Sequence, residues 1–351
     1  MKKNTRKIMV GGLAVGGGAP VSVQSMLCAP PHDIPANIAQ ATALKTAGCQ
    51  ILRVAVPDRE SLRLIPAIKE AVDIPLVADI HFDHKLALES VAAGVDKIRL
   101  NPGNIGGPEK IAQVAKACRK KKIPIRVGVN AGSLEKELLA RHGGPTPAAM
   151  VESALGQTAL LEKCDFRDIA VSLKCSDVRG TVEACRLFAQ ASTYPQHIGV
   201  TESGTEGIGI IKSAIGIGSL LLDGIGDTIR VSLTADPVKE VKAGIDILRA
   251  LGLRKGVNVI SCPTCGRCRI NLIPLAEGVE KAMANLEGSL TVAVMGCAVN
   301  GPGEAAHADI GVAGGEGEGL LFADGKILEK VPQEKILERL VELAHARLAQ
   351  K

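Results

Sequence analysis

Four cysteines near the C-terminal end of the chain have the spacing of ligands for a metal or an iron–sulfur cluster. Two residues separate Cys262 from Cys265 and Cys265 from Cys268, and Cys297 follows on a later segment. Two cysteines separated by two residues can hold one metal from a tight turn, and a cysteine from another loop adds a further ligand. Soft thiolates of this kind select zinc or iron–sulfur clusters.

A loop rich in glycine and proline follows Cys297 and favours a cluster over two other interpretations. The loop Asn300–Glu304 (NGPGE) presents a carboxylate on a backbone that can approach a bulky inorganic centre. A closed zinc site of four cysteines has no need of that carboxylate. A redox disulfide between Cys262 and Cys265 requires a thioredoxin-like context, which the sequence lacks. The residues themselves leave all three interpretations open.

Basic side chains recur at or near the ends of strand-like segments earlier in the chain. Five of these positions are cationic: Arg53, Arg99, Arg126, Lys174 and Arg230. Because guanidinium groups match phosphate oxygens in a bidentate way, their convergence predicts a site for a phosphorylated or diphosphorylated small molecule. Other polar residues near strand ends are candidates for the same site: Asp79, His81, Asn130, Glu202 and Ser232. Alternatively, some cations pair with Asp79 and Glu202 in an internal salt-bridge layer.

The segments that position these residues alternate between short β-branched runs and amphipathic helices. The strand candidates are Val21–Gln24, Ile51–Val56, Leu76–Ile80, Lys97–Leu100, Ile125–Val129, Ile169–Leu173, His197–Val200 and Thr228–Ser232. Alternation of this kind predicts parallel strands with right-handed crossovers, and eight units predict an α/β fold of the (β/α)8 TIM-barrel type. An open doubly wound sheet is the alternative, but Gly16–Gly18 precedes a strand and does not fit a dinucleotide-binding turn. In a barrel the polar strand ends meet at one face.

A second, smaller α+β domain is predicted to carry the cysteines. We place the substrate-binding barrel in residues 1–254 and the cluster-binding domain in residues 255–351. Its predicted strands are Val257–Ile260, Leu290–Val294, Asp309–Ala313, Leu320–Ala323 and Ile327–Val331, the last two joined by a type I′ turn at Asp324-Gly325. Its predicted helices are Leu272–Leu286 and Gln333–Leu348. Gly314–Gly319 is expected to be a mobile loop.

Composition argues against several classes of function. The net charge is only +5 and aromatic residues make up 1% of the chain, which argues against nucleic-acid binding. No apolar run reaches the ~20 residues that span a bilayer, and the longest, Ile208–Leu222, is interrupted by Lys212. The basic N-terminus leads into glycine-rich sequence instead of a signal peptide. We therefore expect a cytoplasmic protein whose ten cysteines are metal ligands and free thiols.

Long motifs spread over nearly the whole chain resemble those of the 4-hydroxy-3-methylbut-2-enyl diphosphate synthases, the iron–sulfur enzymes of the methylerythritol phosphate pathway of isoprenoid synthesis. The motifs are Gly17–Met26, Arg53–Asp58, Ala78–Phe82, Arg99–Gly106, Arg126–Asn130, Cys262–Cys265 and Asn300–Ala305. The chain length resembles the two-domain bacterial form of this family.

The resemblance implies the reductive ring opening of 2-C-methyl-D-erythritol 2,4-cyclodiphosphate to an allylic diphosphate, with loss of water. It implies a [4Fe-4S] cluster held by three cysteines and a glutamate, which match Cys262, Cys265, Cys297 and Glu304. The family's substrate site matches Arg53, Arg99, Arg126, Asn130, Lys174, Glu202, Arg230 and Ser232, with Asp79 and His81 as less certain matches. Glu202 is then a candidate proton donor or orienting group, and Glu304 a candidate catalytic ligand.

The resemblance also implies an electron donor and a dimeric assembly, and two other functions stay open beside it. Flavodoxin or ferredoxin would donate electrons, and a head-to-tail homodimer would close each barrel with the small domain of the other copy. The segment Leu27–Asp33 (LCAPPHD) departs from the family pattern, and Cys268 is a cysteine that the pattern does not need. One non-redox alternative is a phosphate-binding barrel lyase or aldolase with Lys174 as a Schiff-base lysine and a structural zinc domain. Another is a metal-stabilised scaffold without catalysis.

Overall fold

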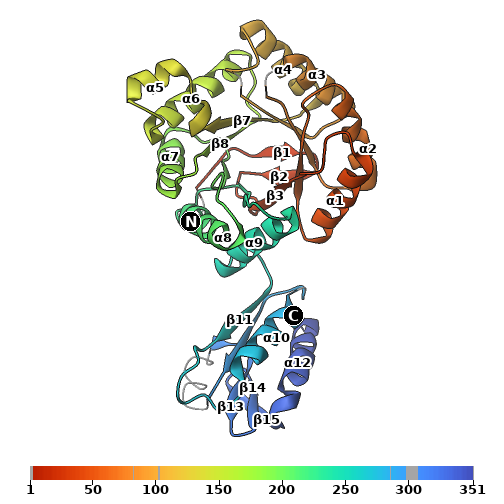
Figure 1. Cartoon of the computed structure of the whole chain (residues 1–351), viewed down its shortest axis with the longest axis vertical. Helices are drawn as coiled ribbons and strands as arrows, with labels where there is room; N and C mark the ends of the chain where they lie inside the picture. Colours follow the sequence, from red (N-terminus) through yellow and green to blue (C-terminus); the bar gives the residue numbers. More distant parts are fainter. Residues whose placement is uncertain (1–2, 82, 102, 285, 298–306, 351) are drawn as a thin grey trace. The chain divides into compact units, whose positions relative to one another are not determined.

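The computed structural model describes residues 3–81, 83–101, 103–284, 286–297 and 307–350. The chain divides into two compact units, Met1–Leu251 and Gly252–Lys351, each with its own hydrophobic core (Figure 1). Within the described ranges, no helix is both long enough and apolar enough to cross a membrane.

The first unit is a barrel of parallel strands. They are β3 (Ser22–Met26), β4 (Ile51–Ala55), β5 (Leu76–Asp79), β6 (Lys97–Leu100), β7 (Ile125–Asn130), β8 (Ile169–Lys174), β9 (His197–Ile198) and β10 (Thr228–Ile229). Their order is β8-β7-β6-β5-β4-β3-β10-β9. A parallel bridge between Val171 and Gln196 brings β8 beside the start of β9 and closes the barrel. The predicted (β/α)8 fold is confirmed, with β9 and β10 shorter than expected.

Helices surround the barrel, and their first residues explain where several of them begin. They are α1 (Ile34–Thr46), α2 (Leu64–Ala71), α3 (His84–Ala93), α4 (Pro108–Lys121), α5 (Lys136–His142), α6 (Pro147–Lys163), α7 (Val178–Ala191), α8 (Glu206–Leu222) and α9 (Pro237–Ala250). The side chains of Asp33, Thr146 and Asp236 each accept a hydrogen bond from a backbone amide in the first turn of α1, α6 and α9. Proline in the first turn of the same helices reinforces these starts, because its missing N–H would have no helical acceptor there.

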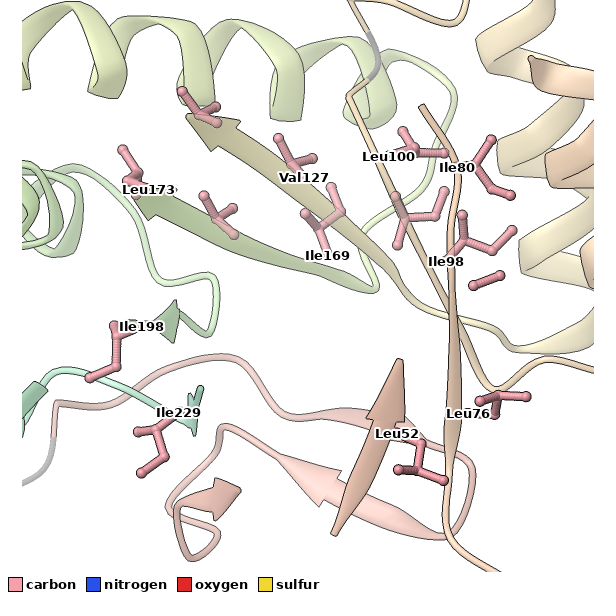
Figure 2. Packing of buried hydrophobic residues seen from close by; sticks show 14 of the residues in the cluster. Leu52, Leu76, Ile80, Ile98, Leu100, Val127, Ile169, Leu173, Ile198 and Ile229 are labelled. Atoms are coloured by element: carbon pink, nitrogen blue, oxygen red, sulfur yellow. The ribbon is translucent and has the colours of Figure 1, made fainter. Parts of the chain in front are cut away.

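The strands alternate between an apolar outer face and a polar inner face. Outward-facing residues such as Leu52, Ile98 and Val127 pack in the main hydrophobic core, part of which is shown in Figure 2. The alternate positions carry Arg53, Arg99 and other polar side chains, because successive residues of a strand point to opposite faces. Barrel interiors are ordinarily filled by branched aliphatic side chains, so this charged interior indicates a function.

A short hairpin closes the N-terminal end of the barrel. Strands β1 (Ile8–Val10) and β2 (Leu13–Val15) pair in antiparallel fashion. Ile8, Val10 and Val15 form a separate apolar cluster with residues at the beginnings of β4, β5 and β8, namely Ile51, Val77 and Ala170. This hairpin was not predicted from the sequence. Because it covers the N-terminal end, the C-terminal ends of the strands form the open mouth.

The second unit is a mixed sheet covered by two helices. Its strands are β11 (Val257–Ser261), β12 (Leu290–Met295), β13 (Ile310–Gly315), β14 (Glu318–Ala323) and β15 (Lys326–Pro332), hydrogen-bonded in that order. The first three are parallel, and β13, β14 and β15 are antiparallel. Helices α10 (Leu272–Met283) and α12 (Ile336–Gln350) pack on its core.

Two connections between strands in this unit were predicted from the sequence, one correctly and one wrongly. The predicted type I′ turn is confirmed, since Asp324 and Gly325 have φ values of 48° and 73°. The expectation of a mobile loop at Gly314–Gly319 is wrong, because Gly314 pairs with Gly319 in a continuous hairpin. A Cβ on Gly319 would come within 2.7 Å of the Ile336 side chain. Close packing explains this glycine better than flexibility does.

Candidate functional site

Asp79 lies at the centre of an ion-pair cluster inside the barrel. It ends β5, is buried, and accepts hydrogen bonds from Arg53 on β4 and from Arg99 on β6, the latter at 3.3 Å. His81 Nε2 lies 3.2 Å from the same carboxylate. Burial alone would raise the pKa of Asp79, but the nearby Arg53, His81 and Arg99 outweigh it and hold the pKa well below its usual range. The salt-bridge layer that the sequence allowed therefore accounts for two of the five predicted cations.

Arg126 and Lys174 are buried without an acidic partner among the described residues. Arg126 is only 2% exposed; its Nη1 donates to Gln24 Oε1 at 3.3 Å, and its Nε has no acceptor in the described structure. Burial lowers the pKa of Arg126 and of Lys174 well below their ordinary values, and neighbouring cations lower both further. Two buried cations without counter-charges favour the binding of an anion, because an uncompensated buried charge is costly.

Arg230 is held by a carboxylate that the sequence analysis did not identify. It follows β10, and its Nη2 lies 3.4 Å from both oxygens of Glu240 on α9. Glu240 is buried and also accepts hydrogen bonds from the Ser25 hydroxyl at 3.2 Å and from the Leu233 amide at 2.9 Å. These contacts position the Arg230 guanidinium. No strand-end pattern could have found Glu240, because it lies on a helix.

Further inward-facing polar residues were missed, among them Gln24, Lys97 and His197. All are buried, and neither ring nitrogen of His197 has a partner in the described structure. Lys97 lies two residues before Arg99 on β6, so strand periodicity alone could have placed it on the inner face. Counted over the described residues, the interior carries six cationic side chains (Arg53, Lys97, Arg99, Arg126, Lys174 and Arg230) against the carboxylates of Asp79 and Glu240. This excess fits a ligand with several negative charges.

Gly128 on β7 makes room for one of these cations. A Cβ at this position would lie 2.5 Å from Nε of Arg99. Absence of a side chain therefore allows the guanidinium to lie across the inner face of β7 while it pairs with Asp79.

The remaining predicted residues occupy different places. Asn130 ends β7 in register with Lys174, and Ser232 lies two residues beyond Arg230, so both follow the inward-facing positions towards the mouth. His81 is exposed next to Asp79. Glu202 is exposed, takes part in none of the ion pairs of the described residues, and has a left-handed φ of 51°. The structure thus brings the basic residues together, and among the described residues Glu202 forms no ion pair with any of them.

Replacing Asp79 with asparagine should destabilise the protein strongly. The change leaves Arg53 and Arg99 buried near one another without their shared anion, a type of loss that costs about 3–5 kcal/mol. We expect a clearly lower melting temperature for Asp79→Asn, and recovery of part of the loss when a polyanion such as pyrophosphate is added. The pKa of Asp79 is depressed in the folded state, so its carboxylate stabilises the fold fully at neutral pH. This stabilisation is lost progressively as the pH falls from the unfolded-state pKa of Asp79, ~4, towards its lower folded-state pKa. An unchanged melting temperature in Asp79→Asn would contradict the stabilising role of Asp79.

The cysteines of the second unit gather at the ends of two paired strands. Ser261 of β11 pairs with Val294 of β12, so Cys262 and Cys297 follow neighbouring parallel strands. The Gly296 amide donates to Cys262 Sγ at 3.2 Å. The pKa of Arg267 is raised first by its hydrogen bond to Cys265 and further by the thiols of Cys265, Cys297 and Cys262. Three thiols that act on one guanidinium, with a backbone amide directed at one sulfur, fit a thiolate-bound centre.

Among the described residues, no three Cys, His, Asp or Glu side chains stand in a metal-holding arrangement. Glu304, the predicted fourth ligand, lies outside the described residues. Cys268 differs from these cysteines in its hydrogen bond, since its thiol donates to the Ile270 carbonyl at 3.2 Å. Cys262 and Cys268 both pack against the apolar core of this unit.

Solved structures resemble the barrel at low sequence identity. The 3-dehydroquinate dehydratase from Geobacillus kaustophilus has a TM-score of 0.51 and 14% identity, over 71% of this chain and 99% of that one. The dihydropteroate synthase from Yersinia pestis has a TM-score of 0.50 and 12% identity, over 70% of this chain and 98% of that one. These similarities show the fold alone.

Similarity to curated proteins is much higher and covers both units. The protein named 4-hydroxy-3-methylbut-2-en-1-yl diphosphate synthase (flavodoxin) from Geobacter sulfurreducens is 57% identical over 352 residues, with 100% of each chain covered. The protein of that name from Caldicellulosiruptor saccharolyticus is 53% identical over 96% of this chain and 97% of its own. The family model described as the GcpE TIM-barrel domain matches residues 5–245, and that of the GcpE protein C-terminal domain matches residues 258–346. The chain therefore belongs to the GcpE family.

Proposed function

We propose that the chain is a 4-hydroxy-3-methylbut-2-enyl diphosphate synthase. It takes 2-C-methyl-D-erythritol 2,4-cyclodiphosphate, two electrons and two protons, and yields the open allylic diphosphate and one water. The observation that carries this proposal is the full-length identity of 57% to a protein of that name. The cationic barrel interior is independent support, because it suits a substrate with two phosphates.

The barrel residues bind and orient the diphosphate. Arg126 and Lys174, which lack acidic partners among the described residues, supply charge directly to phosphate oxygens. Arg53, Arg99 and Arg230 are held in place by Asp79 and Glu240 and add donors around them. Asn130 and Ser232 supply neutral hydrogen bonds nearer the mouth. Fixed donors of this kind hold the reacting carbon in one position, which lowers the entropic part of the barrier.

Cys262, Cys265, Cys297 and Glu304 are the residues that would hold a [4Fe-4S] cluster. Such a cluster supplies low-potential electrons one at a time and a Lewis-acidic iron for the departing hydroxyl group. The positions of Cys262 and Cys297, which follow the neighbouring parallel strands β11 and β12, support this assignment. Glu304 is the harder and more easily displaced ligand of the four. Glu202 remains a candidate proton donor.

Electron delivery and assembly complete the proposal. The relatives' names specify flavodoxin, an acidic carrier that suits a chain with a net charge of +5, and ferredoxin is the alternative donor. We place the enzyme in the cytoplasm, as a head-to-tail homodimer in which each small domain closes the barrel of the other copy. The composite site then needs residues from both copies.

Iron and acid-labile sulfide analysis of anaerobically purified protein tests the proposed function. We expect four of each per chain, together with turnover of the cyclic diphosphate under a chemical reductant. Colourless protein with stoichiometric zinc and no turnover would instead support the barrel lyase or aldolase, or the non-catalytic scaffold.

Mixed dimers test the closure of one copy's barrel by the other. Arg126→Ala impairs the barrel site and Cys297→Ser impairs the cluster site, so each variant alone should be nearly inactive. Mixing them should restore about a quarter of the parent activity, because half of the dimers are mixed and each mixed dimer has one intact composite site. No recovery, with mixed dimers shown to form, would contradict closure in trans.

A further inference from the structure

Glu135 is a carboxylate that forms no ion pair with any of the described residues. It lies between β7 and α5, and its Oε1 accepts hydrogen bonds from the Ser153 hydroxyl and the Gln157 side-chain amide of α6, both at 3.1 Å. Its Oε2 is buried and accepts no hydrogen bond within the described part of the chain. Two neutral donors on one oxygen leave the negative charge uncompensated, which is costly where an oxygen is removed from water.

Gln157 brings a second buried oxygen to this carboxylate. Its side chain is only 3% exposed, and its Nε2 donates to Glu135 Oε1 at 3.1 Å and to Ser153 Oγ at 3.0 Å. The bond to the carboxylate fixes the orientation of the amide, because only the NH2 group can donate. The amide oxygen, Oε1, is buried and meets no donor among the described residues. A buried oxygen of this kind ordinarily binds a donor, a water molecule or an ion.

Asn101, which follows β6, places a third side-chain oxygen beside the other two. It is 6% exposed, and its Oδ1 accepts a hydrogen bond from the Gly103 amide at 3.0 Å. A Cβ on Gly103 would lie 3.2 Å from Asn101 Oδ1 and 3.5 Å from Glu135 Oε1, so both oxygens border the same point. A carbonyl oxygen has two lone pairs, so Asn101 Oδ1 can take a second partner. The segments after β6 and β7 thus meet α6 at a cluster of oxygen atoms.

The chemistry of these oxygens selects a hard cation with a single charge. Carboxylate and carbonyl oxygens suit alkali and alkaline-earth ions, whereas sulfur and imidazole ligands suit zinc and iron. One carboxylate balances one positive charge. Calcium sites ordinarily use more carboxylates, and magnesium keeps several of its waters. A water molecule in the same place could donate to both buried oxygens but would leave the charge of Glu135 unbalanced.

We propose that Asn101, Glu135 and Gln157 bind a monovalent metal cation, potassium or sodium, which holds the segment after β6 against α6. Asn101 lies two residues after Arg99, so the cation would stabilise the part of the barrel mouth that follows one of the phosphate-binding arginines. The inference rests on the proposed function only for its effect on substrate, because cation binding and its effect on stability need no turnover.

Thermal melting of the cluster-loaded protein in different chloride salts at equal ionic strength tests this site. Potassium or sodium chloride should raise the melting temperature by roughly 3–8 °C over choline chloride, because choline is too large for the site and a ligand that binds only the folded state stabilises it. Affinity for the cyclic diphosphate should also be about 5-fold or more higher in the potassium or sodium salt. Thallium(I), which substitutes for potassium, should give an anomalous scattering peak at Glu135 in crystals.

Glu135→Gln separates a cation ligand from a purely structural residue. The amide keeps the shape of the side chain and removes its charge, so the variant should melt at one temperature in all three salts. In choline chloride it should melt no lower than the parent, because the uncompensated charge is gone. A structural role alone would instead lower the melting temperature in every salt. The matched control Glu137→Gln changes an exposed carboxylate of α5 and should keep the cation dependence of the parent.

Gln157→Glu tests the charge rule at the same site. A second carboxylate should transfer the stabilisation from potassium or sodium to calcium. Equal melting of the parent in all three salts would show that water occupies the site and would overturn the inference, as would stabilisation of the parent by magnesium or calcium alone. Cation dependence that persists in Glu135→Gln would refute this location. Absence of turnover with the cyclic diphosphate would overturn the proposed function and leave the cation site standing.

Discussion

Cys297→Ser is expected to purify without iron and without activity, as are Cys262→Ser and Cys265→Ser, whereas Cys268→Ser is expected to keep both. The first three thiols influence a common guanidinium, that of Arg267. Cys268 instead donates its thiol to the Ile270 carbonyl. Four thiolates would also close the cluster and leave no iron for substrate, as in a simple electron carrier.

Iron and sulfide content and visible absorption of anaerobic protein measure this prediction without reference to turnover. Glu304→Ala should abolish turnover and yield a cluster that loses iron readily, because a displaceable carboxylate would be missing. The serine variant of Cys268 is the matched control, since it removes a thiol from the same loop. Loss of iron in Cys268→Ser, together with an active and stable Glu304→Ala, would falsify the ligand set of three cysteines and one glutamate.

Arg126→Ala and Lys174→Ala should each weaken binding of the cyclic diphosphate by about 10- to 100-fold. A hydrogen bond to a charged group contributes about 1.5–3 kcal/mol, and both residues lack an acidic partner among the described residues that would compete for their charge. Titration calorimetry on oxidised, cluster-loaded protein measures the change without catalysis. Arg119→Ala, which removes an exposed arginine of α4, is the control.

Lys174→Met distinguishes binding from folding. Methionine approximates the volume of the lysine stem without its charge, so the free protein should melt at the same temperature or higher while binding is lost. Burial and nearby cations lower the pKa of Lys174 in the free protein, so parent affinity should fall as pH rises and the cation is lost. The methionine variant should show a flatter pH profile. Equal affinity and an equal pH profile in both proteins would contradict the barrel site.

The alternation of short strand-like runs with amphipathic helical segments was sufficient to predict the barrel, because it implies parallel strands joined by helices. The same reasoning identified the cations at the strand ends but not the polar residues deeper in the barrel. Lys97 and His197 lie at the beginnings of β6 and β9, deeper in the barrel, and only the two-residue period assigns them inward. Glu240 acts from a helix, so its role depends on tertiary packing alone.

Glycine caused the clearest error of the sequence analysis. Gly314–Gly319 was expected to be mobile because glycine favours loops, but Gly314 and Gly319 lie in strands where neighbouring atoms leave no room for a Cβ. The β1–β2 hairpin was missed for a related reason, since strands of three residues are too short to show a period. Spacing of the cysteines could not choose among zinc, disulfide and cluster, because all three use the same residues.

The hairpin at the closed end of the barrel has a consequence for synthesis on the ribosome. Ile8, Val10 and Val15 emerge first, yet one of their partners, Ala170, is translated much later. At ~5–20 residues per second, the nascent hairpin waits roughly ten to thirty seconds for that partner. During this interval its apolar side chains are available to chaperones and to other chains. Strands of only three residues keep the exposed edge short, which limits wrong pairing before translation reaches β8.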